Sequence, residues 1–159
     1  MSQRADFMQQ SPELTKKLVE LDALFKKTTI EESIQDLVKI RASQINGCAF
    51  CLDMHVKQAT IRGERPLRIL HLPAWRESPL FNPRERASLA WAEVLTQIPA
   101  QGVADDYYER VGAQLSEKEM SDLAFIVASI NAWNRINIGF RTVPGSRDKA
   151  YGLDKAKLA

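Results

Sequence analysis

The sequence predicts an all-α domain of about six to seven helices, with a CxxC cysteine pair at the N-terminus of one of them. Apolar residues recur three and four positions apart through most of the chain, which is typical of helices with one buried face. Residues that favour helix starts and stops separate these segments. No run of alternating apolar and polar residues is long enough to predict a strand.

Helix signals in the first part of the chain mark two segments. Ser11 followed by Pro12 is typical of an N-cap and a first helical position, so we expect a helix over residues 12–25. Thr29 and Glu32 have the spacing of a capping box, which predicts that a second helix starts at Thr29 and runs to residue 45.

The middle of the chain contains the cysteine motif. Asn46-Gly47 is a helix stop, and the next helix is expected to begin at Cys48 and to end near Gly63. A short helix over residues 66–72 follows. Asn82-Pro83 again has the order of a cap and a proline, and predicts a helix to about residue 98.

The last third contains a weaker, more polar helix and a long apolar one. The weaker helix is expected over residues 103–115. Ser116 and Glu119 form a second capping-box pattern, which predicts a long helix to about residue 143 that is central to a core or a subunit interface. Asn131, Asn134, Arg135 and Asn137 interrupt it, and such polar groups are expected to hydrogen-bond other helices, line a cavity or face a subunit contact.

Length and composition predict one domain over residues 1–159, with a core at about residues 12–143 and peripheral tails. The 22 basic and 20 acidic residues leave a net charge of only +2, and no dense basic run is present, so we expect no nucleic-acid partner. No apolar stretch is long enough to span a bilayer, and the N-terminal residues lack an apolar signal core. We therefore expect no membrane partner and a cytoplasmic protein.

The chain has two cysteines, Cys48 and Cys51, and their spacing restricts what they can do. A disulfide between them would close so short a loop that it would barely constrain the unfolded chain. In a reducing compartment such a pair indicates a redox or metal-binding role. A structural disulfide is a poor explanation.

Helix geometry adds His55 to the pair. Residues three and four apart are neighbours on a helix, so Cys48 should face Cys51 and Cys51 should face His55. The helix N-terminus would favour a thiolate on Cys48, and His55 could take a proton from Cys51 or, as imidazolium, pair with its thiolate. The sequence does not rank the two effects. The second thiol can trap a sulfenic acid as a disulfide.

Zinc is an alternative use of the same residues. Cys48, Cys51, His55 and His71 would supply four ligands of the types that zinc accepts. Three of them lie on one continuous helix, however, and are awkwardly placed to surround an ion. We therefore expect no metal, and we expect His71 to be structural. No flavin, haem or nucleotide motif is visible, so no cofactor is expected.

Four stretches resemble the alkylhydroperoxidase D-like (AhpD-like) proteins of the carboxymuconolactone decarboxylase superfamily. They cover most of the chain and include the cysteine motif in its CxxCxxxH context. The stretches are DLVKIRASQINGCAFCLDMH (36–55), AWRESPLF (74–81), RERASLAWAEVLT (84–96) and INAWNRINIGFR (130–141).

The resemblance implies an AhpD-like all-α fold, a homo-oligomer such as a trimer or hexamer, and a site. Carried over by position, Cys51 is the peroxide-attacking thiol, Cys48 resolves it, and His55 helps to ionise the attacking thiol. The family's relay glutamate stands twelve residues before the first cysteine, where this chain has Asp36. The side chain of Asp36 is shorter by one methylene, and Ala49 and Phe50 replace the histidine that the best-studied members have between the cysteines.

The resulting hypothesis is a thiol-dependent peroxidase, with a hydroperoxide as substrate and an external dithiol as reductant. One alternative is a non-enzymatic redox sensor or adaptor that uses the same disulfide. Another is a lyase like carboxymuconolactone decarboxylase, although that chemistry does not call for a cysteine pair.

Overall fold

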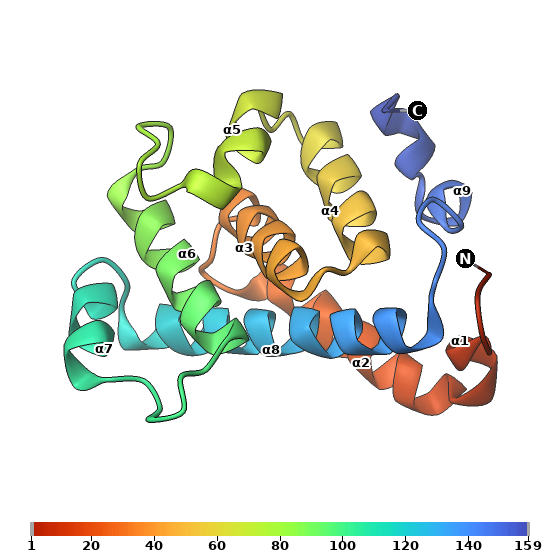
Figure 1. The fold of residues 1–159 in the computed structure, drawn as a ribbon, viewed down its shortest axis with the longest axis horizontal. Helices are drawn as coiled ribbons and strands as arrows, with labels where there is room; N and C mark the ends of the chain where they lie inside the picture. The colour runs from red at the N-terminus through yellow and green to blue at the C-terminus, as the bar shows by residue number, and fades with distance from the viewer. Residues whose placement is uncertain (1, 159) are drawn as a thin grey trace.

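The computed structural model describes residues 2–158, and within this range the chain is helical with no β-strand (Figure 1). It has nine α-helices and three short 3-10 helices. The α-helices are α1 (Phe7–Gln10), α2 (Pro12–Leu24), α3 (Glu32–Asn46), α4 (Ala49–Ile61), α5 (Pro66–His71), α6 (Pro83–Thr96), α7 (Asp105–Gly112), α8 (Glu117–Phe140) and α9 (Asp148–Tyr151). The 3-10 helices are η1 (Phe25–Lys27), η2 (Leu72–Ala74) and η3 (Leu153–Ala156).

Seven of these α-helices, α2 to α8, correspond to the segments that the sequence predicted. The four-residue helices α1 and α9 lie in the tails and had no sequence signal. The all-α prediction is therefore confirmed, with small differences at the ends: α6 stops at Thr96 and α8 at Phe140, each earlier than expected.

Helix α3 lies at the centre, where it packs against α4, α6 and α8 (Figure 1). The long helix α8 runs along one side of the molecule, and α6 also packs against it. Apolar side chains from these helices form the main core, among them Leu37, Ile40, Leu89, Leu123 and Ile126, all nearly inaccessible to solvent. This packing fixes the start of α4, and hence the cysteine motif, relative to α8.

Local cap signals explain where most helices begin. Ser116 forms the predicted capping box with Glu119. Asn82 is the N-cap of α6, as its position before Pro83 predicted, and it also forms a complete capping box with Glu85. Ser11 precedes Pro12 at the start of α2, but its side chain makes no cap hydrogen bond. The two complete boxes open the helices that pack against α3.

The predicted capping box at Thr29 is wrong. Helix α3 begins at Glu32, with Glu31 at the N-cap. The side-chain amide of the buried Gln35 donates hydrogen bonds to the carbonyls of Phe25 (3.0 Å) and Ile30 (2.9 Å). These bonds hold the chain in a non-helical turn between η1 and α3, so the N-cap of the helix lies two residues later than its sequence pattern predicts.

Both tails pack against the helical core, so the expectation of merely peripheral tails is incomplete. Near the N-terminus, Phe7 is buried and its ring lies 6.3 Å from that of Trp133 and 5.8 Å from that of Phe140. Near the C-terminus, Leu153 is buried and η3 packs against α4. The N-terminal tail therefore packs against α8, and the C-terminal tail packs against α4, the helix that carries the cysteines.

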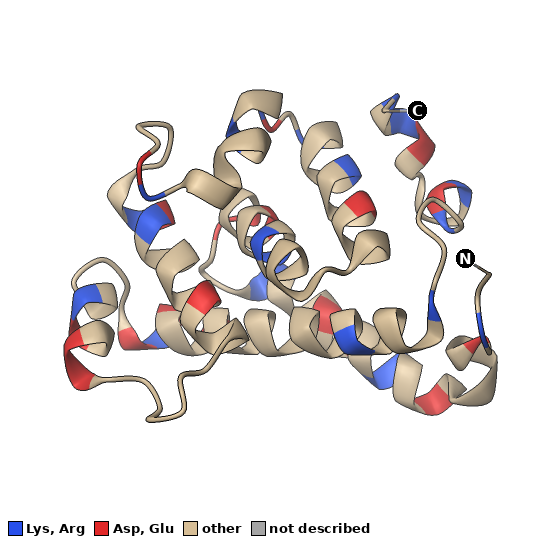
Figure 2. Ribbon diagram, in the orientation of Figure 1, with Lys and Arg blue, Asp and Glu red and all other residues tan. Residues whose placement is uncertain are grey.

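Charged residues of both signs are interspersed along the helices (Figure 2). Many of them pair: Arg68 contacts Glu64 and Glu85, and Arg84 contacts Glu31 and Glu119. Among the described residues, no helix is both long and apolar enough to cross a membrane.

Candidate active site

The cysteine motif lies at the N-terminus of α4, as predicted. Gly47 ends α3 in the left-handed conformation (φ 69°), which glycine adopts without steric cost, and the chain turns there into α4. Cys48 is the N-cap residue of α4, and its Sγ accepts a hydrogen bond from the backbone N–H of Cys51 (3.4 Å). The first sulfur therefore occupies the position where a helix terminus stabilises an anion.

The two thiols are reduced, buried and interdependent. Hydrogen bonds from the Cys51 thiol and from its backbone N–H outweigh burial and lower the pKa of Cys48 to about 7. The same contact with Cys48, together with burial, raises the pKa of Cys51. The pair thus loses its first proton near neutral pH, and the negative charge that forms resides mainly on Cys48.

Asparagines from α8 meet the cysteines from the opposite side. The Nδ2 of Asn137 donates to Cys51 Sγ (3.5 Å) and to the carbonyl of Trp133 (2.9 Å). Because the second acceptor is a carbonyl, it fixes which end of the amide faces the sulfur. The Oδ1 of Asn137 is buried and has no partner within residues 2–158.

The other asparagines of α8 make the interhelical hydrogen bonds that the sequence led us to expect. Asn134 is fully buried; it donates to Ser43 Oγ (3.1 Å) and accepts from Asn46 Nδ2 (2.8 Å). Asn131 donates to Thr96 Oγ1 (3.1 Å) and also accepts from Asn46. The bonds to Ser43 and Asn46 hold α8 against α3 beside the cysteine motif, and the bond to Thr96 holds α8 against α6.

His55 lies two turns into α4 and is buried. Its Nδ1 donates to Oε1 of Gln58 (2.8 Å), which leaves Nε2 as the free acceptor nitrogen. Burial, reinforced by the positive charge of Lys39, lowers the pKa of His55 to about 3. The imidazole is therefore neutral at physiological pH, and the imidazolium–thiolate pair considered from the sequence does not form in this state.

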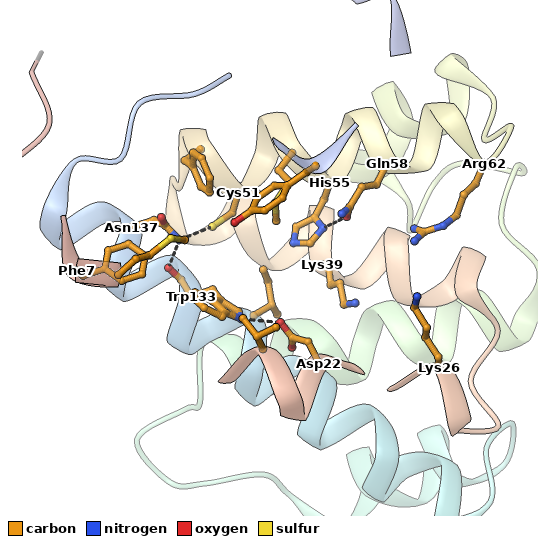
Figure 3. A pocket seen from close by; sticks show the side chains of 16 residues that line it. Phe7, Asp22, Lys26, Lys39, Cys51, His55, Gln58, Arg62, Trp133 and Asn137 are labelled. Atoms are coloured by element: carbon orange, nitrogen blue, oxygen red, sulfur yellow. Dashed lines mark hydrogen bonds between the residues drawn. The ribbon is translucent and has the colours of Figure 1, made fainter. Parts of the chain in front are cut away.

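Cys51 and His55 lie at a common cavity of about 300 Å3 (Figure 3). Both side chains line it, whereas Cys48 does not. The other lining residues come from α1, α2, η1, α3, α4, α8 and α9: Phe7, Met8, Val19, Asp22, Lys26, Lys39, Phe50, Met54, Gln58, Arg62, Ile130, Trp133, Asn137 and Tyr151. The sulfur that a small molecule in this cavity would meet is therefore that of Cys51.

Asp36 is not among the residues that line this cavity. It is buried on α3, and its Oδ1 accepts a hydrogen bond from Nη1 of Arg62 at 2.5 Å. Burial raises the pKa of Asp36, and the Arg62 guanidinium opposes that rise. Arg62 does line the cavity, so Asp36 borders the site only through this ion pair.

His71 lies on α5, and its ring nitrogen contacts Ser78 Oγ (3.0 Å) rather than the cysteines. Within residues 2–158, no group of three or more His, Cys, Asp or Glu side chains is arranged to hold a metal ion.

Several residues of the site carry no recognisable sequence signal. Phe7 and Tyr151 reach the cavity from the two tails, and Lys39 reaches it from α3. Gln58 could have been found, because it stands three residues after His55 on the same helix face.

Comparison with known proteins places the chain in a family. The family model described as "Carboxymuconolactone decarboxylase family" matches residues 12–94. The uncharacterized protein YdfG of Bacillus subtilis (strain 168) is 41% identical over 138 residues, which cover 87% of this chain and 94% of that protein.

Solved structures share the fold. A crystal structure of a protein of unknown function from Agrobacterium tumefaciens, described as a putative antioxidant defence protein AhpD, is 38% identical, with a TM-score of 0.85 over 90% of this chain and 98% of that one. The apo structure of the debrominase Bmp8 is 20% identical, with a TM-score of 0.77 over 94% of this chain and 80% of that one. The second likeness concerns the fold alone.

Proposed function

The chain belongs to the carboxymuconolactone decarboxylase family and has an AhpD-like fold, and from this premise we propose that it is a thiol-dependent peroxidase that reduces hydroperoxides. The observation that carries the proposal is the unequal placement of the two cysteines. Cys51 lines the cavity, while Cys48 lies behind it at the N-cap of α4 and outside the cavity wall. A substrate-facing thiol with a second thiol one turn away is what a dithiol peroxidase requires.

The first step moves the negative charge to the cavity. The Cys51 proton passes to the Cys48 thiolate along their mutual contact, and Asn137 stabilises the resulting Cys51 thiolate by hydrogen bonding. The neutral His55, whose Nε2 is free, accepts a hydrogen bond from the incoming hydroperoxide O–H.

The chemical step breaks the O–O bond. The Cys51 thiolate attacks the terminal oxygen of ROOH, an S–O bond forms, and the alkoxide leaves. The alkoxide takes the proton of the Cys48 thiol to become ROH, which restores the Cys48 thiolate. Cys51 is then a sulfenic acid. The Cys48 thiolate attacks its sulfur, a disulfide forms, and hydroxide leaves and is protonated to water.

Regeneration needs an external dithiol. Its thiolate attacks the disulfide to give a mixed disulfide, and its second thiol completes the exchange, so that both protein thiols are restored and the dithiol is oxidised. The net reaction consumes ROOH and two thiols and gives ROH, water and one disulfide. No metal or cofactor takes part in this scheme.

Intact-mass measurement tests the scheme. One equivalent of cumene hydroperoxide added to the reduced protein should remove two hydrogens from the wild type. The Cys48→Ser variant should instead gain one oxygen, on Cys51, and more slowly, because it lacks the thiolate that accepts the Cys51 proton. The Cys51→Ser variant should remain unchanged on the same timescale. A Cys51→Ser variant that consumes peroxide at the wild-type rate would refute the assignment. Formation of the disulfide without turnover in the presence of dithiols would favour a redox sensor.

We also propose that the chain assembles into a homo-oligomer such as a trimer or hexamer. Exposed apolar side chains on α8 support this, since Phe125 is 60% exposed and Ile138 44% exposed in the single chain. Light scattering coupled to gel filtration measures the mass of the particle. A monomeric mass at micromolar concentration would contradict the proposal.

A further inference from the structure

One end of the cavity contains two lysines that lack a partner. Lys39 on α3 and Lys26 in η1 both line the cavity, and neither forms a hydrogen bond or an ion pair with any residue in the range 2–158. The ammonium group of Lys39 lies 5.7 Å from the centre of the Phe25 ring. In Figure 3 the charged groups of Lys26, Lys39 and Arg62 lie at the same end of the cavity, while Cys51 and Asn137 lie toward the other end.

The carboxylates near the two lysines bind other residues. Arg62 forms an ion pair with Asp36 at 2.5 Å and a longer one with Glu32 at 3.7 Å. Asp22 lines the cavity, but its two oxygens accept hydrogen bonds from Ser129 Oγ (2.6 Å) and Trp133 Nε1 (2.7 Å). It acts on Lys39 only through space. Three carboxylates thus act on Lys39 through space, but none of them forms a hydrogen bond or an ion pair with Lys39 or Lys26.

A largely buried ammonium group without a partner is costly, because burial removes its water without supplying an acceptor. Burial accordingly lowers the pKa of Lys39. Since the protein supplies no carboxylate that contacts Lys39, the missing acceptor fits an anionic group on a ligand. Arg62 illustrates the contrast: it has its acceptor within the chain.

The remainder of the cavity wall is apolar. Its side chains between the lysines and Cys51 include Val19, Phe50, Met54, Ile130 and Trp133. A volume of about 300 Å3 suits a small organic molecule rather than a polymer. The wall therefore fits a compact apolar body with a charged group at one end.

We propose that the cavity binds an organic hydroperoxide that carries a carboxylate, with the carboxylate on Lys39 and Lys26 and the peroxide group at Cys51. This inference rests on the proposed peroxidase function and adds a substrate class to it. The apolar body of the substrate packs between the two ends, and the lysines orient the peroxide toward the sulfur.

The test compares two hydroperoxides that differ in charge: cumene hydroperoxide bearing a para-carboxylate, and the methyl ester of the same compound. The wild type should show a kcat/KM about tenfold higher for the acid, the size expected of a charge-assisted hydrogen bond. Lys39→Gln should abolish the preference, and Lys39→Arg should retain most of it. Lys27→Gln is the control for loss of a nearby positive charge. Lys27 follows Lys26 in η1 but does not line the cavity, so this variant should behave like the wild type. Equal kcat/KM for acid and ester in the wild type would overturn the proposal.

Binding without peroxide chemistry separates this proposal from the peroxidase proposal. The probe is para-isopropylbenzoate, whose binding can be followed by calorimetry and by the fluorescence of Trp133 in the cavity wall. We expect saturable binding in the wild type, about tenfold weaker in Lys39→Gln. If the protein binds this carboxylate but no hydroperoxide oxidises it, the anion site stands and the peroxidase proposal is refuted. If the methyl ester oxidises the protein, but the probe does not bind and the acid is not preferred, the peroxidase proposal stands and the anion site is refuted.

Discussion

The backbone N–H of Cys51 donates a hydrogen bond to Sγ of Cys48, 3.4 Å away, at the first turn of α4. The residue that lines the cavity thereby stabilises the negative charge of the residue behind it. When the pair has lost one proton, it contains one thiolate and one thiol, and the position of the remaining proton decides which sulfur can attack.

The titration of the reduced protein should reveal this arrangement. One thiolate should form with a midpoint near pH 7, because contacts from Cys51 lower the pKa of Cys48 to about 7. The second should not form at the value of a free cysteine, about 8.5, because it would have to ionise beside the first. Thiolate ultraviolet absorbance measures both steps.

The sign of the pH dependence follows from the same pKa. As the pH falls through 7 the pair becomes protonated and oxidation by peroxide slows, whereas as the pH rises through 7 one thiolate forms and the rate approaches a plateau. The Cys48→Ser variant is the control, because it should lose the step near pH 7. A wild-type midpoint at the free-cysteine value would show that the helix terminus and Cys51 do not act on Cys48.

The hydrogen bond from Asn137 to Cys51 predicts a role in the attack. Asn137→Ala removes the side-chain donor from the Cys51 sulfur and should slow sulfenic acid formation about tenfold, the size of one hydrogen bond to a charged group. Asn137→Asp places a carboxylate beside the sulfur and should slow it further by repelling the thiolate. Stopped-flow oxidation of the Cys48→Ser background isolates this step.

Asn131→Ala is the matched control for these variants. Asn131 is also a buried asparagine of α8, but its bonds run to Thr96 and Asn46 and it does not line the cavity. Its loss should lower the free energy of unfolding and leave the oxidation rate nearly unchanged. Equal slowing in both alanine variants would mean that Asn137 acts only by holding α8 in place.

The contact between His55 and Gln58 predicts an unusual histidine titration. With its pKa lowered to about 3 by burial, His55 should show no protonation step near pH 6.5 in a nuclear magnetic resonance titration of its ring protons. Gln58→Glu replaces the neutral acceptor by a carboxylate, which favours the imidazolium and should raise the pKa of His55. A wild-type midpoint near that of free histidine would contradict the buried, neutral state.

The sequence predicted those elements whose cause is local. Gly47 ends α3, and the capping boxes at Asn82 and Ser116 start α6 and α8, because each signal involves neighbouring residues only. The spacing of the CxxC motif likewise predicted its place at a helix N-terminus. The Thr29 signal failed because a side chain of the helix itself, that of Gln35, binds the carbonyls of Phe25 and Ile30 and stabilises a different turn.

The cavity could not be predicted in this way, because it depends on packing between segments that are far apart in sequence. Phe7 and Tyr151 come from opposite ends of the chain, and polar tails give no periodic pattern from which their packing could be inferred. The protonation of the cysteines and of His55 is also set by burial and by neighbours on other helices. Spacing on α4 placed these residues near each other but did not determine which of them is charged.

The ion pair between Asp36 and Arg62 suggests a second role for Asp36, charge balance, which can be tested against the predicted role in proton relay. If Asp36 mainly neutralises Arg62, then Asp36→Asn keeps an acceptor for the guanidinium but adds positive charge to the lysine end of the cavity. We then expect kcat/KM to rise about threefold for the para-carboxylate hydroperoxide and to stay unchanged for its methyl ester. A proton-relay role predicts instead that Asp36→Asn slows the oxidation of Cys51 by both compounds.

Two further measurements make the comparison strict. Glu32→Gln removes the more distant acidic neighbour of Arg62, at 3.7 Å and 59% exposed, so its effect on the carboxylate substrate should be smaller than that of Asp36→Asn. The free energy of unfolding of Asp36→Asn should change by less than about 1 kcal/mol, because Arg62 is partly exposed and relief of the buried charge offsets the lost ion pair. An Asp36→Asn variant that folds normally yet oxidises slowly with both hydroperoxides would assign the carboxylate to proton transfer rather than to charge balance.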